Sequence, residues 1–137
     1  MESPGCVQHT EKVIETLGYW PSFHDAEVIL VSATRAMAGH PVATSARLCV
    51  NVRQYKEVGA GTAGYEMVCI RSVLIEFLFS DLQYLSLEDF NHQNVIDSIA
   101  FTVLENQSIE VNVASIWGLG GVIRCARVEV KDAARLL

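Results

Sequence analysis

The sequence predicts an α+β fold: a mainly antiparallel β-sheet, arranged as a sandwich or an open barrel, with a short N-terminal helix. Several segments alternate apolar and polar residues with the period of a half-buried strand. One N-terminal segment has helical spacing instead, and no regular succession of helices and strands follows it. The chain has 137 residues, 50% of them hydrophobic and 19% charged, which indicates a single domain over residues 1–137 with its own core.

The first two elements are expected within the first 41 residues. A helix is predicted over residues 7–17, where three apolar residues recur at helical spacing. Thr10 is a candidate cap at its start, and Gly18 is a candidate stop. Residues 27–35 are rich in valine, isoleucine and leucine and predict a strand, which ends in a loop around residues 39–41.

The clearest alternation lies in residues 46–53 and predicts a half-buried strand. A bent strand is expected over residues 67–79, because the phase of its apolar residues shifts near Arg71 and Ser72, as at a β-bulge. The apolar face of the first of these strands consists of Ala46, Leu48, Val50 and Val52.

A hairpin and a last strand complete the predicted sheet. Residues 99–103 and 109–113 have matching apolar positions on either side of the polar segment 105–108, as in a β-hairpin. Residues 123–130 are expected to form the final strand.

One glycine-rich segment matches a known binding motif in sequence but not in its predicted secondary-structure context. Residues 59–64 fit G-x-G-x-x-G, the dinucleotide-binding fingerprint, and they follow a predicted strand. That fingerprint requires a helix opening at its last glycine. The segment that follows is β-branched and strand-like, so a hairpin loop is expected instead.

The charge of the chain indicates which kinds of partner it favours, and its cysteine pattern indicates whether metal sites or disulfides are expected. Ten Lys and Arg against sixteen Asp and Glu give a net charge of −6, which disfavours nucleic acid and mildly favours a basic protein partner. Solubility alone is the favoured explanation of this charge. The longest apolar run, residues 73–79, is far shorter than the roughly 20 residues that span a bilayer, and the N-terminus does not resemble a secretory signal. We therefore expect a cytoplasmic protein without a membrane partner or cofactor.

No metal or disulfide pattern links the four cysteines, which are expected to be reduced and mostly buried: Cys6, Cys49, Cys69 and Cys125.

The segment 20–28, with sequence WPSFHDAEV, concentrates special residues just before the first strand. The Trp-Pro step fixes the backbone direction. His24 and Asp25 could act as a general base pair or, with His92, as metal ligands. Adjacent residues of an extended chain point to opposite sides, so a structural role, fixing the loop through hydrogen bonds, is the favoured interpretation.

A second informative run covers residues 81–96. Leu85, Leu87 and Phe90 are expected to pack, and the polar residues 91–94 that follow provide donors and acceptors in a turn. Four successive polar side chains suit either a buried network or an exposed recognition edge, and a buried network is the more common arrangement.

A third run places Trp117 beside three glycines between two strands. This tryptophan can be a core residue or an exposed anchor at a protein interface, and the core is favoured. The chain contains no Gly-x-Ser-x-Gly nucleophile motif and no pair of carboxylates with a spacing typical of acid–base catalysis. No feature of the sequence requires an enzyme.

Together these runs resemble the immunity protein 50 family of bacterial polymorphic toxin systems. The resemblance is carried by WPSFHDAEV at 20–28, LEDFNHQNV at 87–95, and a glycine-containing turn followed by CARVEV at 125–130. It implies a small, cytosolic, non-enzymatic protein that binds and neutralises a toxin made by the same cell or its kin. The positions that match the pattern are Trp20, Pro21, Phe23, His24, Asp25, Asn91 and Asn94.

The expected partner is thus a cognate toxin, and the negative charge favours a basic one. Trp117 and His92 are further candidates for contact with it, and the free chain is expected to be a monomer or a weak homodimer. Two alternatives remain at this point. One is a small metal-assisted hydrolase that uses His24, Asp25 and His92. The other is a self-associating structural module that uses its apolar strands as an oligomer surface.

Overall fold

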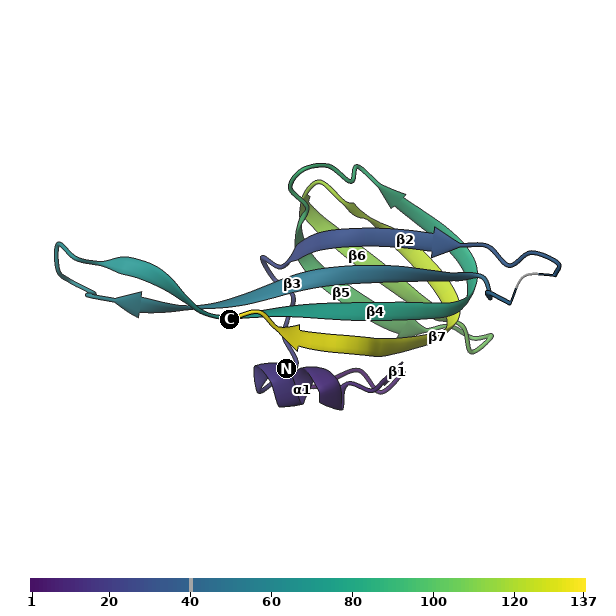
Figure 1. Cartoon of the computed structure of the whole chain (residues 1–137), viewed down its shortest axis with the longest axis horizontal. Helices are drawn as coiled ribbons and strands as arrows, with labels where there is room; N and C mark the ends of the chain where they lie inside the picture. The colour runs from purple at the N-terminus through teal and green to yellow at the C-terminus, as the bar shows by residue number, and fades with distance from the viewer. Residues whose placement is uncertain (40) are drawn as a thin grey trace.

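The structure is a computed structural model that describes residues 1–39 and 41–137 (Figure 1). His40, in the loop predicted at 39–41, lies outside the described residues. These residues form one helix and seven strands: β1 (Val7–Gln8), α1 (Glu11–Leu17), β2 (Glu27–Thr34), β3 (Ser45–Val58), β4 (Glu66–Glu88), β5 (Val95–Val103), β6 (Ile109–Trp117) and β7 (Gly120–Arg135).

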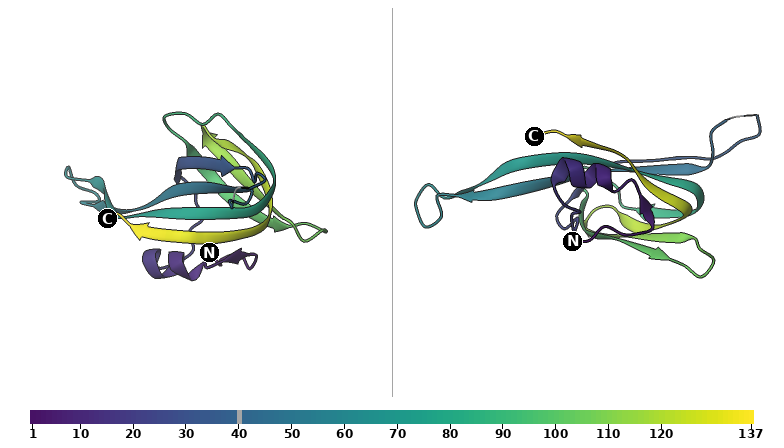
Figure 2. Two further views of the ribbon diagram at one scale, coloured as in Figure 1. Left: turned by 45° about the vertical axis from the view of Figure 1, so that its right-hand side comes forward. Right: turned by 90° about the horizontal axis from the view of Figure 1, so that it is seen from below.

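All strands belong to one sheet, in the order β1-β7-β4-β3-β2-β5-β6. Neighbouring strands are antiparallel except β1, which runs parallel to β7. Because β6 also pairs with the first part of β7, the sheet curls back on itself, as Figure 1 and Figure 2 show. The predicted α+β class with a short N-terminal helix is confirmed, and the sheet takes the curled form rather than two separate layers.

The helix is shorter than predicted. Val7 and Gln8 pair with β7 instead of starting the helix, and His9 follows with a left-handed φ of 61°. Thr10 stands at the N-cap but makes no side-chain capping bond, whereas Gly18 ends the helix as predicted, with φ 96° and its N–H bonded to the Ile14 carbonyl. The described chain contains no helix with the length and apolar character needed to span a membrane.

The predicted strands are found, and most are longer than their local patterns indicate. In β3 and β4, the pairs Gln54↔Arg71 and Tyr55↔Cys69 leave one extra residue on β4, which places the predicted bulge within a residue or two of Arg71. The β5–β6 hairpin has the predicted register, and residues 59–64 form the turn between β3 and β4 as expected.

The core lies on the inner face of the curled sheet and beneath α1. Phe77 of β4 is fully buried at its centre, with ring centroids 6.3 Å from Trp20 and 5.9 Å from Phe23. It also contacts the rings of Phe79 and Phe101. The apolar face predicted for β3 is buried in this core. Side chains from strands distant in sequence therefore meet around one aromatic cluster, and each adds buried apolar area to the stability of the fold.

An ion pair on the outer face of the sheet makes stability depend on pH. Arg47 donates to both carboxylate oxygens of Glu76, at 3.1 Å from Nε and 2.8 Å from Nη2. These hydrogen bonds lower the pKa of Glu76 from its ordinary value, while partial burial opposes the shift. A carboxylate with a lowered folded-state pKa stabilises the fold above its unfolded pKa, and this contribution is lost as the pH falls through the folded pKa.

Replacing Arg47 with methionine should therefore reduce the melting temperature near neutral pH, and the difference from the parent should shrink as the solution is acidified. Melting curves recorded from about pH 7 to about pH 3, on either side of the unfolded glutamate pKa, measure this. A difference that stayed constant over that range would show that Arg47 acts through packing alone.

The distal part of the β3–β4 hairpin projects from the body of the molecule. We call residues 53–71 the β-arm; Figure 1 shows it extending to the left, and the second view of Figure 2 shows it well beyond α1.

Candidate functional site

The segment 20–28 turns the chain from α1 into β2, and its apolar residues belong to the core. Trp20, Pro21 and Phe23 are buried, and the Trp20 and Phe23 rings meet edge to face at 5.6 Å. Phe23 and Asp25 have left-handed φ angles of 65° and 64°. The backbone here bonds to itself and to β5, from Ala26 N to Phe23 O and from Asp25 N to Ile96 O. The first motif therefore holds the fold at this turn.

His24 and Asp25 are exposed, and they approach each other. His24 Nδ1 lies 3.0 Å from Asp97 Oδ1, and its Nε2 lies 3.6 Å from Asp25 Oδ2. The expectation that the two side chains point apart is wrong, because the left-handed residues on either side of His24 replace extended backbone with a turn. Across residues 1–39 and 41–137, no three His, Cys, Asp or Glu side chains form a group that could hold a metal ion. The structure thus does not assemble His24, Asp25 and His92 into such a group.

Asn94 is the centre of a buried hydrogen-bond network. Its Oδ1 accepts from the backbone N–H groups of Asn91 at 2.9 Å and Leu119 at 3.1 Å. Its Nδ2 donates to the carbonyl oxygens of Asn91 at 2.8 Å and Val28 at 3.4 Å. One side chain, 3% exposed, therefore joins the loop before β5 to β2 and to the β6–β7 turn. The predicted buried network is thus found for Asn94 alone among residues 91–94.

Residues 91–93 are exposed on the loop that this network holds. Asn91 bonds to the Asp89 carbonyl and to the Gln93 N–H, and His92 is exposed. Leu85 and Leu87 pack against the core as predicted. Phe90 does not: it is 52% exposed, because β4 ends at Glu88 and the chain then leaves the sheet.

The expected burial of Trp117 is also wrong, since its side chain is 58% exposed. Gly118, with φ 81°, reverses the chain so tightly that a Cβ there would lie 2.6 Å from the Gln93 carbonyl oxygen and 2.7 Å from Asn94 Oδ1. Leu119 then enters the core, with 1% exposure. The interior position at this turn is filled by Leu119, so Trp117 faces solvent.

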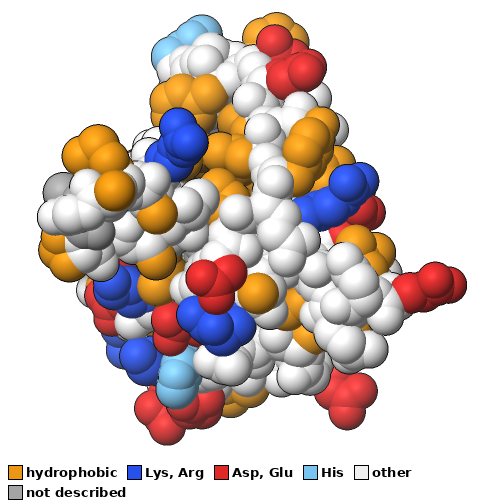
Figure 3. All heavy atoms as spheres, turned by 90° about the vertical axis from the view of Figure 1, so that its right-hand side faces the viewer, with side chains coloured by type: hydrophobic (Ala, Val, Ile, Leu, Met, Phe, Trp, Pro, Cys, Tyr) orange, Lys and Arg blue, Asp and Glu red, His pale blue; other side chains and the backbone are white. Residues whose placement is uncertain are grey.

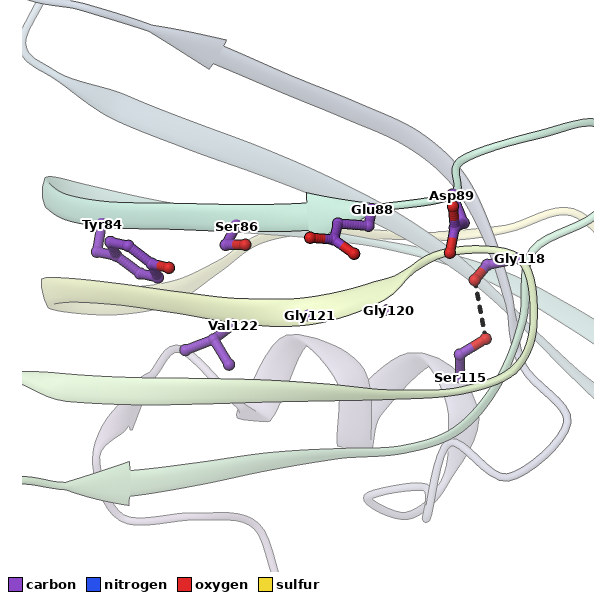
Figure 4. A pocket seen from close by; sticks show the side chains of 9 residues that line it. All are labelled: Tyr84, Ser86, Glu88, Asp89, Ser115, Gly118, Gly120, Gly121 and Val122. Atoms are coloured by element: carbon purple, nitrogen blue, oxygen red, sulfur yellow. Dashed lines mark hydrogen bonds between the residues drawn. The ribbon is translucent and has the colours of Figure 1, made fainter.

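Beside this turn lies an open groove of about 470 Å³, shown in Figure 4. Tyr84, Ser86 and Glu88 project from β4 along one side of it. Its opposite side comes from the β6–β7 turn, where the Ser115 hydroxyl donates to the Gly118 carbonyl at 2.9 Å. The residues that line the groove are Tyr84, Ser86, Glu88, Asp89, Ser115, Gly118, Gly120, Gly121 and Val122.

Glycine at the start of β7 keeps this groove open. Gly121 has φ 149°, and a Cβ there would overlap the Ser86 carbonyl oxygen on β4. A Cβ on Gly120 would lie 2.9 Å from the Ser115 side chain. Any side chain at these two positions would therefore push β4, β6 and β7 apart or fill the groove.

The margin of the groove is both acidic and aromatic. Glu88 and Asp89 are exposed at the end of β4, and Tyr84 lies beneath the Arg124 guanidinium, 5.1 Å from its ring centroid. Phe90 directly follows Asp89, and Trp117 directly precedes Gly118. We call this set the acidic–aromatic rim: Tyr84, Glu88, Asp89, Phe90 and Trp117.

Trp117 was predicted from the sequence as a possible partner contact, and the other rim residues were not. Glu88, Asp89 and Phe90 form an acidic and aromatic run inside the second motif, and this run was the signal in the sequence that could have indicated the rim.

Charged side chains of both signs are interspersed with apolar ones at the end of the molecule away from the β-arm (Figure 3).

Two of the four cysteines, Cys49 and Cys125, are buried as expected, whereas Cys6 and Cys69 are only half-buried. All four are free. Burial raises the pKa of Cys125 to about 11 and also raises the pKa of Cys49. Buried thiols with raised pKa values stay protonated at neutral pH and react slowly.

Fold and groove together define a β-sheet protein with an open groove bordered by carboxylates and exposed aromatic rings, and aromatic residues are enriched at protein-binding surfaces. The chain belongs to the immunity protein 50 family, whose model matches residues 9–135, nearly the whole chain. The resemblance found in the sequence is thus confirmed. No curated protein and no solved structure matches the chain.

Proposed function

We propose that this chain is a non-enzymatic immunity protein that binds a cognate bacterial toxin domain in the cytoplasm and thereby blocks its activity. Membership of the immunity protein 50 family supports the class of function. The observation that supports the binding surface is the acidic–aromatic rim, where Trp117 and Phe90 are 58% and 52% exposed and directly neighbour the groove residues Gly118 and Asp89 in the sequence. Exposed aromatic anchors of this kind dominate the binding energy of many interfaces.

The conformation of the rim is fixed by hydrogen bonds in the free chain. Asn94 binds both the loop that carries Phe90 and the turn that carries Trp117, so little conformational entropy remains to be lost on binding. The net charge of −6 favours a basic toxin, since opposite charges accelerate the encounter of two proteins.

The direct test has two steps. The tagged chain is used to capture its partner from cells that express both, and the captured protein is then produced alone and together with this chain. The proposal expects growth arrest by the partner alone and restored growth on co-expression. A partner that is not toxic, or whose toxicity persists beside equimolar immunity protein, would overturn the proposal.

Variants of the rim test the surface itself. Trp117→Ala should weaken capture of the toxin by about tenfold or more, as loss of a central aromatic anchor does. Glu88→Lys should slow association most strongly at low salt. Glu105→Lys, which makes the same charge change on the exposed β5–β6 turn, is the matched control. Equal effects of the two lysine substitutions would mean that only net charge matters and that the rim is not the contact.

A further inference from the structure

The β-arm has a free strand edge. In the part of the chain that the structure describes, pairing between β2 and β3 reaches only to Glu27↔Asn51, and residues 52–58 of β3 pair with β4 alone. An unpaired edge presents backbone donors and acceptors to any strand that can align with it. Charged or proline residues often block such edges. This one contains no proline, and its charged residues, Arg53, Lys56 and Glu57, are of both signs.

The β-arm also exposes large apolar side chains. Tyr55 is 49% exposed and Met67 is 54% exposed, and tyrosine and methionine are enriched at protein interfaces. An isolated two-stranded ribbon is marginally stable in water. Additional strands would therefore stabilise this part of the molecule.

The free edge is complementary to a second copy of itself. A two-fold axis perpendicular to the sheet pairs β3 antiparallel to its copy and leaves each face of the ribbon on its own side. Directly opposed residues of an antiparallel pair have their side chains on the same face, whereas consecutive residues of one strand do not. The axis must therefore pass between a residue and its own copy. The free stretch from Val52 to Val58 has Tyr55 at its midpoint. With Tyr55 on the axis, Arg53 of one copy lies opposite Glu57 of the other, and this pairing occurs twice. In the single chain Arg53 Nη1 lies 3.9 Å from Glu27 Oε2, and Glu57 Oε1 accepts from the Tyr65 hydroxyl at 3.3 Å, so both exposed side chains exchange these contacts for the pair between the copies.

The register suits the side chains on both faces. Arg53, Tyr55 and Glu57 alternate along β3 and share one face, so the two ion pairs flank a central pair of tyrosines. Gln54 faces Lys56 of the other copy on the opposite face. The bulge of the hairpin lies on β4, so β3 stays regular along the whole free edge.

Charge favours a second copy at this place. Residues 53–71 contain Arg53, Lys56 and Arg71 against Glu57 and Glu66, so the β-arm carries a charge of +1 on a chain of net charge −6. Two chains of net negative charge can thus associate through the β-arm, where neither chain is negatively charged. Because the β-arm projects from the rest of the molecule, the remaining parts of the two chains stay apart (Figure 2).

The β4 edge of the β-arm is the poorer surface. Its free stretch ends before Ser72, whose backbone bonds to Leu136 and Leu137 of the same chain. It also contains the bulge at Ile70, which interrupts a regular ladder.

We propose that two copies of this chain associate through the free edge of β3, with Tyr55 on the two-fold axis, and form a four-stranded antiparallel ribbon from their β-arms. This is an isologous contact that closes on itself and uses strand addition as its mode of recognition. It does not involve the acidic–aromatic rim, which stays open to a toxin in each copy.

Sedimentation equilibrium of the purified chain over a range of concentrations tests this. The parent should show a monomer–dimer equilibrium. Glu57→Arg places like charges opposite each other twice and should weaken the dimer by about tenfold, whereas Arg53→Glu/Glu57→Arg should restore it. Glu105→Arg is the matched control and should not change the dimer. A monomer at every concentration, or a dimer that Glu57→Arg leaves unchanged, would overturn the proposal.

Cross-linking tests the register. In a Cys69→Ser background, which removes the thiol paired with Tyr55 in the same hairpin, Tyr55→Cys should form an oxidised dimer. Val58→Cys in that background should not, because its counterpart is Val52 of the other copy. Equal cross-linking at the two positions would contradict the proposed axis. Circular dichroism melting curves of all variants confirm that each is folded.

Discussion

Replacing Trp20 with alanine is expected to reduce the free energy of unfolding by about 3–5 kcal/mol, the usual cost of deleting a buried aromatic side chain. Trp20 is 3% exposed and contacts both Phe23 and Phe77, so its removal leaves a cavity lined by rings. A domain of this size has about 5–15 kcal/mol of stability in total. The loss would therefore be readily visible in urea denaturation.

The second tryptophan of the chain is the control. Trp117→Ala removes a side chain that is 58% exposed and should change stability by less than about 0.5 kcal/mol, although it should weaken toxin capture. If Trp20→Ala is too unstable to purify, Trp20→Phe keeps a ring in the site and should show a smaller loss. Similar stability losses at Trp20 and Trp117 would contradict the assignment of one to the core and the other to the rim.

Replacing Asn94 with aspartate is expected to cost about 3 kcal/mol near neutral pH, because it changes the chemistry of a buried group while keeping its shape. The introduced carboxylate can still accept from Asn91 N and Leu119 N. It cannot donate to the carbonyl oxygens of Asn91 and Val28, which Nδ2 binds in the parent. Three segments would then be held less firmly, and the acidic–aromatic rim would lose its support.

The pH dependence of this variant identifies the cause. Burial raises the pKa of the introduced carboxyl above its unfolded value, since the neutral form is favoured there and can donate one hydrogen bond. The deficit should thus be largest near pH 7 and should shrink as the pH falls towards about 4, where the unfolded carboxyl is also protonated. Asn106→Asp, at an exposed position on the β5–β6 turn where Oδ1 only accepts from Ser108 N, is the control and should show little change. A deficit independent of pH would point to altered shape instead of lost donors.

Features that depend on local periodicity could be predicted from the sequence. Alternation along residues 46–53 predicted the buried face of β3, the matched apolar positions on both sides of 105–108 predicted the β5–β6 hairpin, and Gly18 marked the end of α1. Side-chain direction follows from backbone geometry over a few residues, so these elements need no information from the rest of the chain. The family resemblance was equally accessible, because its motifs lie within short runs.

Long-range pairing decided what local patterns could not. Trp20 and Trp117 both stand next to turn residues, yet one is buried and the other exposed, because Leu119 fills the interior at the second turn. The groove exists because β4 pairs with β7 as far as Glu88↔Gly120, bringing together residues more than thirty positions apart. The free edge of β3 likewise depends on where β2 begins. Tertiary contacts set these boundaries, since the free energy of each pairing depends on which distant strand lies alongside.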